Sequence, residues 1–306
     1  MVYNDFGHWI SQQFPFKIQK ISIDAGFSCP NRDGRISFGG CTFCDNKTFS
    51  PAYTNRANSI AEQIEKGKSF FKRKYTNMKF LAYFQAFTNT YAPLDYLKAL
   101  YEEALMQDDI IGLVIGTRPD CVNEDLLNYL AEVNRTKFVL IEYGVETIHD
   151  ATLEHINRGH SFESSAEAIR MTHEKGLLTG AHMILGLPRE NKDMILQQAD
   201  IMSALPIDIL KAHQMQIIKG TALAKEYATT PFHIFSVEEY IELIAEYLSR
   251  LRPTIVIDRF VSEAPKDLLI APQWGLKNYE FTNLLANYLK KNEISQGCKY
   301  NPITTI

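Results

Sequence analysis

The sequence predicts an α/β fold in which helices join parallel strands, as a barrel or as an open sheet. Short apolar runs alternate with stretches of helical periodicity, and this pair recurs at least six times. Parallel strands need crossover connections, which are nearly always right-handed. The chain has 306 residues, 45% of them hydrophobic, and no low-complexity linker divides it, so we expect one domain over residues 1–306.

The first half of the chain supplies four of the expected strands. KIQKISIDAG at 17–26 alternates in polarity and ends in glycine, as a strand does. Ser59 and Asn123 are suitable helix N-caps, and Pro93 stands just before another helix. The expected strands are 17–26, 79–85, 109–117 and 137–145, and the expected helices are 59–75, 94–106 and 123–133.

The second half continues the alternation and adds an extension. Strands are expected at 177–188, 208–218 and 254–260, and helices at 163–176, 194–205 and 236–251. Residues 1–17 form a lead-in with an aromatic cluster, and 18–260 form the core of the sheet. Residues 261–306 form a C-terminal extension, which contains a helical stretch at 279–291 and is a candidate to close one mouth of a barrel.

Composition and charge exclude several classes of protein. The net charge of -4 does not indicate a polyanionic partner for the molecule as a whole. The first residues carry charge and lack a long apolar run, so no signal peptide is expected. No apolar stretch reaches 18 residues, so no membrane span is expected either. We therefore expect a cytoplasmic protein.

Three of the five cysteines lie in one loop, FSCPNRDGRISFGGCTFCDN at 27–46. They are Cys29, Cys41 and Cys44, and the loop follows the first expected strand. In α/β folds the functional groups sit on loops at the carboxyl ends of the strands. In a reducing compartment, such spacing indicates metal binding or catalysis before disulfides.

Three thiolates restrict the metals that this loop suits. Thiolates select zinc, copper(I) or iron–sulfur clusters. Structural zinc needs four ligands, which Asp45 or a distant histidine would complete. A four-iron cluster held by three cysteines leaves one iron with an open position, which is useful only if another molecule binds there. The alternatives are a structural zinc loop or free cysteines in a glycine-rich turn.

The cysteine loop and four later motifs resemble the radical S-adenosylmethionine (SAM) enzymes. The motifs are GTRPDCV at 116–122, EYGVET at 142–147, INRGH at 156–160 and HMILGLP at 182–188. Eleven residues separate Cys29 from Cys41, where most of that superfamily has three. The long gap is similar to that of the branch containing the catalytic subunit of Elongator and its short bacterial relatives of the YhcC/YtqA type. The resemblance spans residues 20 to 290 and implies a partial (β/α)6-type TIM barrel.

The resemblance implies a cofactor pair and a role for the three cysteines. Cys29, Cys41 and Cys44 would hold a [4Fe–4S] cluster, whose open iron binds the amino and carboxylate groups of S-adenosylmethionine. One electron, from a donor such as flavodoxin or ferredoxin, then releases a 5′-deoxyadenosyl radical. Of the remaining cysteines, Cys121 is interpreted as a buried small residue and Cys298 as an unpaired thiol of the extension.

Six further residues match cofactor-binding positions of that family. Gln85 and Thr88 stand where relatives carry a Gly-Gly-Glu-like turn for the methionine amino group. The alternative for Gln85 is a strand-end side chain that faces solvent. Arg118 lies in the turn after the third strand, and its alternative is a surface ion pair with Asp120.

The resemblance assigns the ribose and the carboxylate of the cofactor to the fourth and fifth strands. Glu146 matches a residue that contacts the ribose hydroxyls. Arg158 matches a basic residue that pairs with the methionine carboxylate, which suits the guanidinium fork. His182 occupies a place near the ribose where relatives carry an acidic residue, and its alternative is a hydrogen-bonded core histidine.

The expected substrate is transfer RNA, modified on carbon 5 of its wobble uridine, as in the Elongator branch. KGKSFFKRKY at 66–75 mixes five basic residues with three aromatic residues, a combination that binds nucleic acid, or else forms a solvated helix end. No sequence remains for the acetyltransferase domain of the Elongator subunit. Two alternatives stay open: an oxidoreductase acting on a small molecule, similar to the oxygen-independent coproporphyrinogen oxidases, and a zinc-stabilised RNA-binding module.

Overall fold

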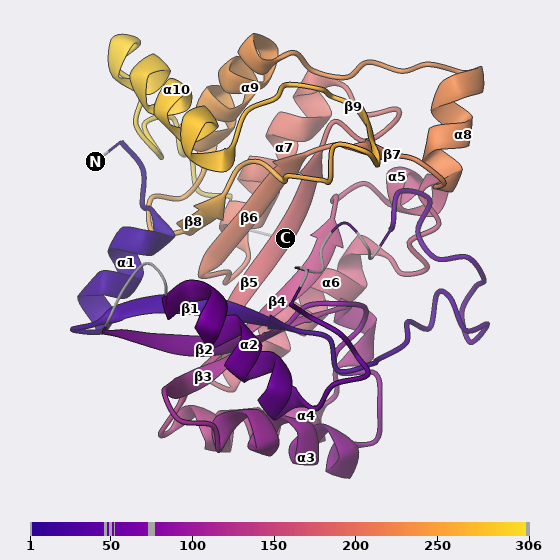
Figure 1. Ribbon diagram of the computed structural model, residues 1–306. Helices are drawn as coiled ribbons and strands as arrows, with labels where there is room; N and C mark the ends of the chain where they lie inside the picture. The colour runs from indigo at the N-terminus through magenta and orange to yellow at the C-terminus, as the bar shows by residue number, and fades with distance from the viewer. Residues whose placement is uncertain (1, 46–47, 49–50, 52, 73–76, 304–306) are drawn as a thin grey trace.

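A seven-stranded, fully parallel sheet forms the centre of the molecule and curls into a half-barrel (Figure 1). The computed structural model describes residues 2–45, 48, 51, 53–72 and 77–303. The strands follow chain order across the sheet, with every neighbouring pair parallel. They are β1 (Lys17–Ile23), β2 (Met78–Phe84), β3 (Ile110–Thr117), β4 (Phe138–Glu146), β5 (Leu178–Leu185), β6 (Ile209–Gln214) and β8 (Val256–Arg259). The predicted α/β half-barrel is confirmed.

Helices connect successive strands and cover the outer face of the sheet (Figure 1). They are α2 (Ile60–Lys72), α3 (Leu94–Leu105), α4 (Glu124–Asn134), α6 (Phe162–Glu174), α7 (Lys192–Ala204) and α9 (Val237–Arg250). The expected caps are present: Asn123 accepts from the Leu126 amide, and Ser59 from the Glu62 amide. Two short helices, α5 (Asp150–His155) and α8 (Ala222–Thr229), lie in the connections after β4 and β7 (Ile217–Ile218). Within the described ranges, no helix combines the length and hydrophobicity needed to cross a bilayer.

The expected strand at 208–218 is wrong in its second half. β6 ends at Gln214, and β7 pairs antiparallel with β9 (Leu269–Ala271) in a separate small sheet. The Gln214 side chain explains the break, because it donates to the Ser262 carbonyl at 3.1 Å and accepts from the Ser262 amide at 3.0 Å. These bonds tie the end of β6 to the segment that follows β8, and the chain turns away from the large sheet.

The C-terminal helix α10 (Asn278–Lys291) packs against α9 on the outside and does not close a mouth of the half-barrel. Its fully buried residues, Phe281, Leu285 and Leu289, recur every four positions and form one apolar stripe. The Phe281 ring stacks on Trp274, with ring centroids 5.9 Å apart. Because this stripe matches the exposed side of α9, the helix extends the outer layer.

The lead-in helix α1 (Phe6–Gln13) lies at the amino ends of the strands, where it closes the other end of the half-barrel. Phe6 and Trp9 pack against the inner face of the sheet. There they cover what we call the apolar floor, which consists of the buried residues Leu81, Val114, Leu140, Ile209 and Val256. The aromatic cluster of the lead-in therefore shields the lumen from water at the amino ends of the strands.

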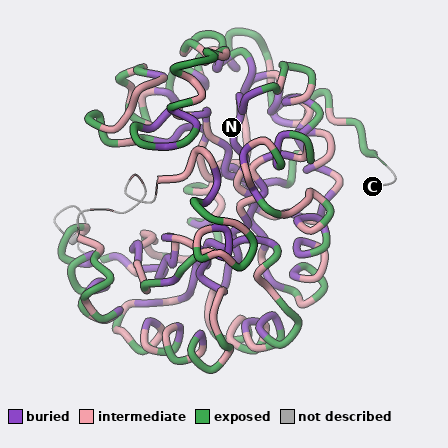
Figure 2. Tube along the Cα trace, turned by 90° about the vertical axis from the view of Figure 1, so that its right-hand side faces the viewer, coloured by how far each residue is buried: buried purple, intermediate pink, exposed green. Residues whose placement is uncertain are grey.

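Side-chain alternation along the strands separates two environments. Residues such as Phe84, Ile115 and Ile141 point outward and form the main core between sheet and helices. Their neighbours point into the lumen, first as the apolar floor and then, toward the carboxyl ends, as polar groups. The tube in Figure 2 follows the same division, with buried segments inside and exposed turns at the periphery. The interior of the half-barrel is thus apolar at one end and polar at the other.

The apolar floor is expected to contribute strongly to stability. Replacing the fully buried Leu140 by Ala should lower the free energy of unfolding by about 2–5 kcal/mol, because it leaves a cavity in the floor. The matched control is Leu284→Ala on α10, where the side chain is 43% exposed and the expected change is below about 0.5 kcal/mol. Urea unfolding followed by circular dichroism measures both; equal losses in the two variants would contradict this assignment.

Candidate functional site

One cavity opens at the carboxyl ends of the strands, and all nine residues expected from the sequence line it. The loop after β1 supplies the cysteines, and the ends of β2 to β5 with their following loops supply the rest. These residues are Cys29, Cys41, Cys44, Gln85, Thr88, Arg118, Glu146, Arg158 and His182. Residues as far apart in the chain as Cys29 and His182 therefore line the same cavity.

The cysteine loop is held by hydrogen bonds that leave its three thiols facing the cavity. Cys41 is buried, Cys29 and Cys44 are half-buried, and none forms a disulfide. Asn31 Nδ2 lies 3.7 Å and Arg158 Nη1 3.6 Å from Cys41 Sγ, so two N–H donors approach this sulfur. Arg32 Nη2 donates to the Cys44 carbonyl at 2.8 Å. Burial, and then the neighbouring Cys41, raises the pKa of the Cys44 thiol to about 11, although Arg32 opposes this. Three sulfur donors gathered in one loop are the donor set that a soft metal site requires.

Glu146 and Arg158 form a buried ion pair on one side of the cavity. Arg158 Nη2 lies 3.5 Å from Glu146 Oε1 and also donates to the Gly144 carbonyl. Glu146 adopts φ of +70° at a register shift of β4, and its side chain lines the cavity, as do Glu142 and Gly144. A Cβ at residue 144 would lie 2.5 Å from Glu146 Oε1, so the pair requires glycine there. The buried Nε of Arg158 has no hydrogen-bond partner among the described residues and is available to a ligand.

Arg118 holds the backbone of Arg158 in the Glu146–Arg158 pair. Its guanidinium binds both carboxylate oxygens of Asp120 at 2.8 Å, and its Nη1 donates to the Arg158 carbonyl at 2.9 Å. Burial raises the pKa of Asp120, but the hydrogen bonds and charge of Arg118 outweigh it and leave that pKa lowered. The surface ion pair considered as an alternative is wrong, because Arg118 is only 2% exposed. Arg118 fixes the backbone from which Arg158 projects.

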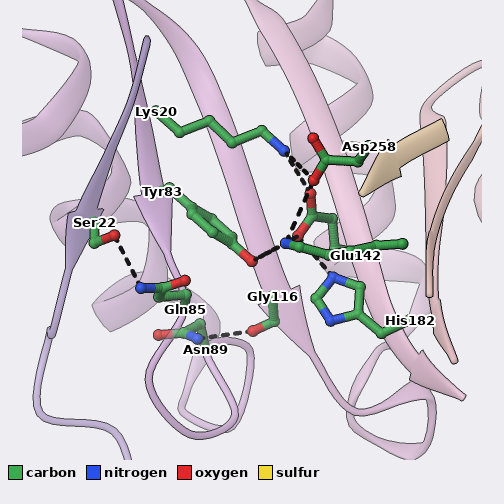
Figure 3. A network of polar contacts seen from close by, with 10 residues as sticks. Lys20, Ser22, Tyr83, Gln85, Asn89, Gly116, Glu142, His182 and Asp258 are labelled. Atoms are coloured by element: carbon green, nitrogen blue, oxygen red, sulfur yellow. Dashed lines mark hydrogen bonds and ion pairs between the residues drawn. The ribbon is translucent and has the colours of Figure 1, made fainter. Parts of the chain in front are cut away.

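Gln85 and Thr88 line the cavity beside the cysteine loop. Gln85 Nε2 donates to Ser22 Oγ at 2.9 Å, so its amide is fixed at the inner end of β1 and not directed only at solvent (Figure 3). Thr88 is buried, and its amide donates to the Ser28 carbonyl at 3.3 Å. The loop after β2 is therefore tied directly to the residue before Cys29.

His182 belongs to a buried network centred on Glu142, which sequence reasoning missed (Figure 3). Glu142 Oε1 accepts from Lys20 at 3.0 Å. Its Oε2 accepts from Tyr83 at 2.7 Å, from His182 at 2.8 Å and from Lys211 at 3.1 Å. Lys20 also contacts Asp258 at 3.1 Å. We call Lys20, Tyr83, Glu142, His182, Lys211 and Asp258 the charged layer; it lies between the apolar floor and the cavity.

The charged layer fixes the ionisation of its members. Burial opposes ionisation of Glu142, but Lys20 and Lys211 outweigh it and hold its pKa well below the ordinary 4.5. Burial lowers the pKa of Lys211 to about 8, against the attraction of Glu142. Burial, and then Lys211, lowers the pKa of His182 to about 4. His182 is therefore neutral at pH 7, and its Nε2 must donate to the ionised Glu142, which leaves Nδ1 unprotonated.

A signal for this layer exists in the sequence. Lys20, Glu142 and Lys211 interrupt the apolar strands KIQKISI, FVLIEYGVE and ILKAHQ. Strands of a buried parallel sheet are normally near-continuous apolar runs, and a charge within one needs a partner. The sequence pattern gave no indication of which charges pair, because the partners lie up to 238 positions apart.

Comparisons with known proteins agree with this geometry. The chain matches the profile of the Radical SAM superfamily over residues 31–200 and that of the Radical SAM C-terminal domain over residues 207–291. It is similar to YtqA of Bacillus subtilis, with 33% identity over 295 residues that cover 96% of this chain and 92% of the relative.

More distant similarities extend to larger proteins. The chain is 26% identical over 195 residues to the tRNA uridine(34) acetyltransferase of Methanocaldococcus jannaschii, covering 61% of this chain and 34% of that protein. The structure of an N-terminally truncated archaeal Elp3 from Methanocaldococcus infernus superposes with a TM-score of 0.66 at 18% identity. The match covers 92% of this chain and 64% of that one, and it demonstrates a shared fold.

Removal of the central carboxylate is expected to destabilise the protein. Glu142→Gln leaves two buried ammonium groups without their main counter-charge, so the free energy of unfolding should fall by about 3–5 kcal/mol at neutral pH. The matched control is Glu132→Gln, at a side chain that is 65% exposed, and should leave the urea midpoint nearly unchanged. The pH dependence follows from the lowered pKa of Glu142: its contribution is complete above the ordinary 4.5 and is lost as pH falls further. A difference between wild type and Glu142→Gln that does not shrink as pH falls below about 4.5 would contradict this.

Proposed function

The chain belongs to the radical SAM superfamily, whose members use a [4Fe–4S] cluster and S-adenosylmethionine, and we propose that Cys29, Cys41 and Cys44 hold the cluster. The observation that carries this proposal is that the three thiols face one cavity together with the residues suited to the second cofactor. Soft sulfur donors suit iron, and three of them leave one iron free for a ligand. Family membership also favours an enzyme over the zinc-stabilised RNA-binding module.

The chain's own residues would bind and orient S-adenosylmethionine. Arg158, with its unpartnered Nε, suits the methionine carboxylate, while the Glu146 carboxylate suits the vicinal hydroxyls of the ribose. The Gln85 amide oxygen and the Thr88 hydroxyl suit the amino group. His182 offers its unprotonated Nδ1 as a further acceptor.

When bound, the two cofactors supply a 5′-deoxyadenosyl radical that abstracts hydrogen from the substrate. The protein keeps other hydrogen donors and water away from it. Phe43, Phe87, Ile184 and Met215 contribute apolar surface to the cavity, and the apolar floor closes it from below. The required electron would come from a small redox protein such as flavodoxin or ferredoxin.

The proposed substrate is a wobble uridine of transfer RNA, modified on its carbon-5 side chain. The similarity to the tRNA uridine(34) acetyltransferase supports this choice. An aromatic cluster provides a second argument: Phe70 is 60% exposed and lies 5.7 Å from Tyr53 between ring centroids. Tyr53 Oη accepts from the Ser22 amide, and Ser22 in turn binds Gln85 at the cavity. Phe70 is thus an exposed aromatic ring connected to the cavity through Tyr53 and Ser22, and it is suited to stacking on a base.

The basic stretch KGKSFFKRKY at 66–75, which also led us to expect binding of transfer RNA, supports the proposal only in part. Residues 73–75 lie outside the described part of the chain. Lys66 is exposed, but Lys68 is buried and pairs with Glu65 at 2.7 Å, so it is not available to a phosphate. Phe70 is therefore the residue of this stretch with the clearest exposed contact surface.

Loss of one cluster ligand should abolish both the cluster and its chemistry. Cys41→Ala, purified and reconstituted without oxygen, is expected to lack the brown colour and about four irons of the wild type. After reduction with S-adenosylmethionine present, it should form no 5′-deoxyadenosine. Cys298→Ala is the matched control, because this thiol is exposed and outside the cavity, and should retain both properties. A Cys41→Ala protein with wild-type iron content would refute the ligand assignment.

Deletion of the gene tests the substrate. Mass spectrometry of tRNA nucleosides should show a changed wobble uridine that wild type restores and Cys41→Ala does not. Phe70→Ala should weaken tRNA binding by about 1–3 kcal/mol, whereas the matched control Tyr279→Ala, on α10 with the same 60% exposure, should not. An unchanged nucleoside profile with active formation of 5′-deoxyadenosine would point to a small-molecule substrate instead.

A further inference from the structure

The β6–β8 side of the cavity carries a cation that forms no hydrogen bond or ion pair with the described residues. In the charged layer, two carboxylates, Glu142 and Asp258, face two ammonium groups, Lys20 and Lys211. Glu142 already accepts four hydrogen bonds, and Asp258 accepts from Lys20. These four charges balance one another. Any further cation on this side must find its counter-ion elsewhere.

Arg259 is that further cation, and an irregularity in β8 brings it to the cavity. Leu210 pairs with Ile257, but the next residue, Lys211, pairs with Arg259, so Asp258 is an extra residue in the strand. Such a bulge changes the direction of the side chains that follow it. Asp258 thereby reaches the charged layer while Arg259 lines the cavity. Both neighbours lie on the inner side, which strict alternation would not allow.

The Arg259 guanidinium has no partner within the described part of the chain. Its Nε is buried and makes no hydrogen bond, and no carboxylate there lies within ion-pair distance of the side chain. Buried donors are normally satisfied, so an unsatisfied guanidinium in a cavity wall indicates a missing acceptor. A ligand that supplies acceptors for Nε and Nη groups would complete this geometry.

Neighbouring groups respond to the same positive field. Burial, and then the charge of Arg259, lowers the pKa of His213 to about 3. His213 Nδ1 lies 3.0 Å from the Gln214 carbonyl, which only accepts, so Nδ1 carries the proton and Nε2 is bare. Lys211 is likewise affected by Lys20 and Arg259, which add to the effect of burial on its pKa. The bare Nε2 of His213 is an acceptor and Lys211 is already paired, so Arg259 is the group of this wall that suits an anion.

We propose that Arg259 anchors an anionic group of the substrate, a carboxylate or a phosphate, at the β6–β8 wall of the cavity. This inference rests on the proposed function, in which Arg158 on the β4 side binds the cofactor carboxylate. The guanidinium fork matches the two oxygens of a carboxylate or phosphate. The two arginines thus divide the cavity into a cofactor side and a substrate side.

Binding of simple anions tests this assignment. Inorganic phosphate and acetate are titrated separately by calorimetry into the cluster-loaded protein saturated with S-adenosylmethionine. At least one should bind to the wild type, and Arg259→Gln should weaken it at least tenfold. Arg259→Lys, a smaller change that keeps the charge but loses the fork, should weaken it about threefold or more. Arg135→Gln, at an arginine that directly follows α4 and is 74% exposed, is the matched control and should bind like the wild type.

The outcomes separate the two sources of the anion. Binding of phosphate alone identifies a phosphate subsite, such as a nucleotide provides, and binding of acetate alone identifies a carboxylate subsite. No binding to the wild type, or wild-type affinity in Arg259→Gln, overturns the proposal. So does a loss of affinity for S-adenosylmethionine, instead of the anion, in Arg259→Gln.

A different measurement tests the proposed function. That function is refuted if the reduced wild type forms no 5′-deoxyadenosine, and this assay requires turnover. The anion titration needs no turnover and is repeated on the purified chain without cluster or S-adenosylmethionine, so its result is independent.

Discussion

A single buried carboxylate connects most of the half-barrel. Glu142 on β4 binds side chains from β1, β2, β5 and β6, and Lys20 extends the connection to Asp258 on β8. A buried charge is tolerable only where partners compensate it, and each partner here is itself buried and dependent on Glu142. The arrangement that neutralises one carboxylate therefore also sets the spacing of the strands around the lumen. The cavity at the carboxyl ends of these strands depends on the same spacing.

The lumen of the half-barrel is lined by apolar residues near the amino ends of the strands and by the proposed cofactor-binding residues at the carboxyl ends. Aromatic rings of α1 seal the apolar floor, the charged layer follows, and the cysteines with Arg158 and Glu146 lie at the open end. This order suits radical chemistry, because the apolar floor closes the lumen at one end while the charged groups near the cavity stay fixed. Burial explains why His182 and His213 stay neutral, whereas Glu142 stays ionised because Lys20 and Lys211 outweigh the effect of burial on its pKa.

Two backbone irregularities give the cavity its particular shape. Glu146 lies at the shift in β4 and pairs with Arg158, and the bulge in β8 delivers Arg259 to the wall beside Lys211. Gly144 leaves the space that the first pair fills. A regular β8 would direct Arg259 into the core between sheet and helices, on the same side as Ile257. The position of Arg259 thus depends on a local departure from the regular sheet.

The sequence by itself determined the order of strands and helices, the α/β class and nine of the residues that line the cavity, because apolar periodicity and short motifs are local properties. Only the tertiary structure decided that residues 208–218 break after β6, that the lead-in and not the C-terminal helix closes a mouth, and that Arg118 is buried. It alone revealed the charged layer and the unpartnered Arg259. These features depend on contacts between residues far apart in the chain and on a one-residue bulge, and neither leaves a periodic trace in the sequence.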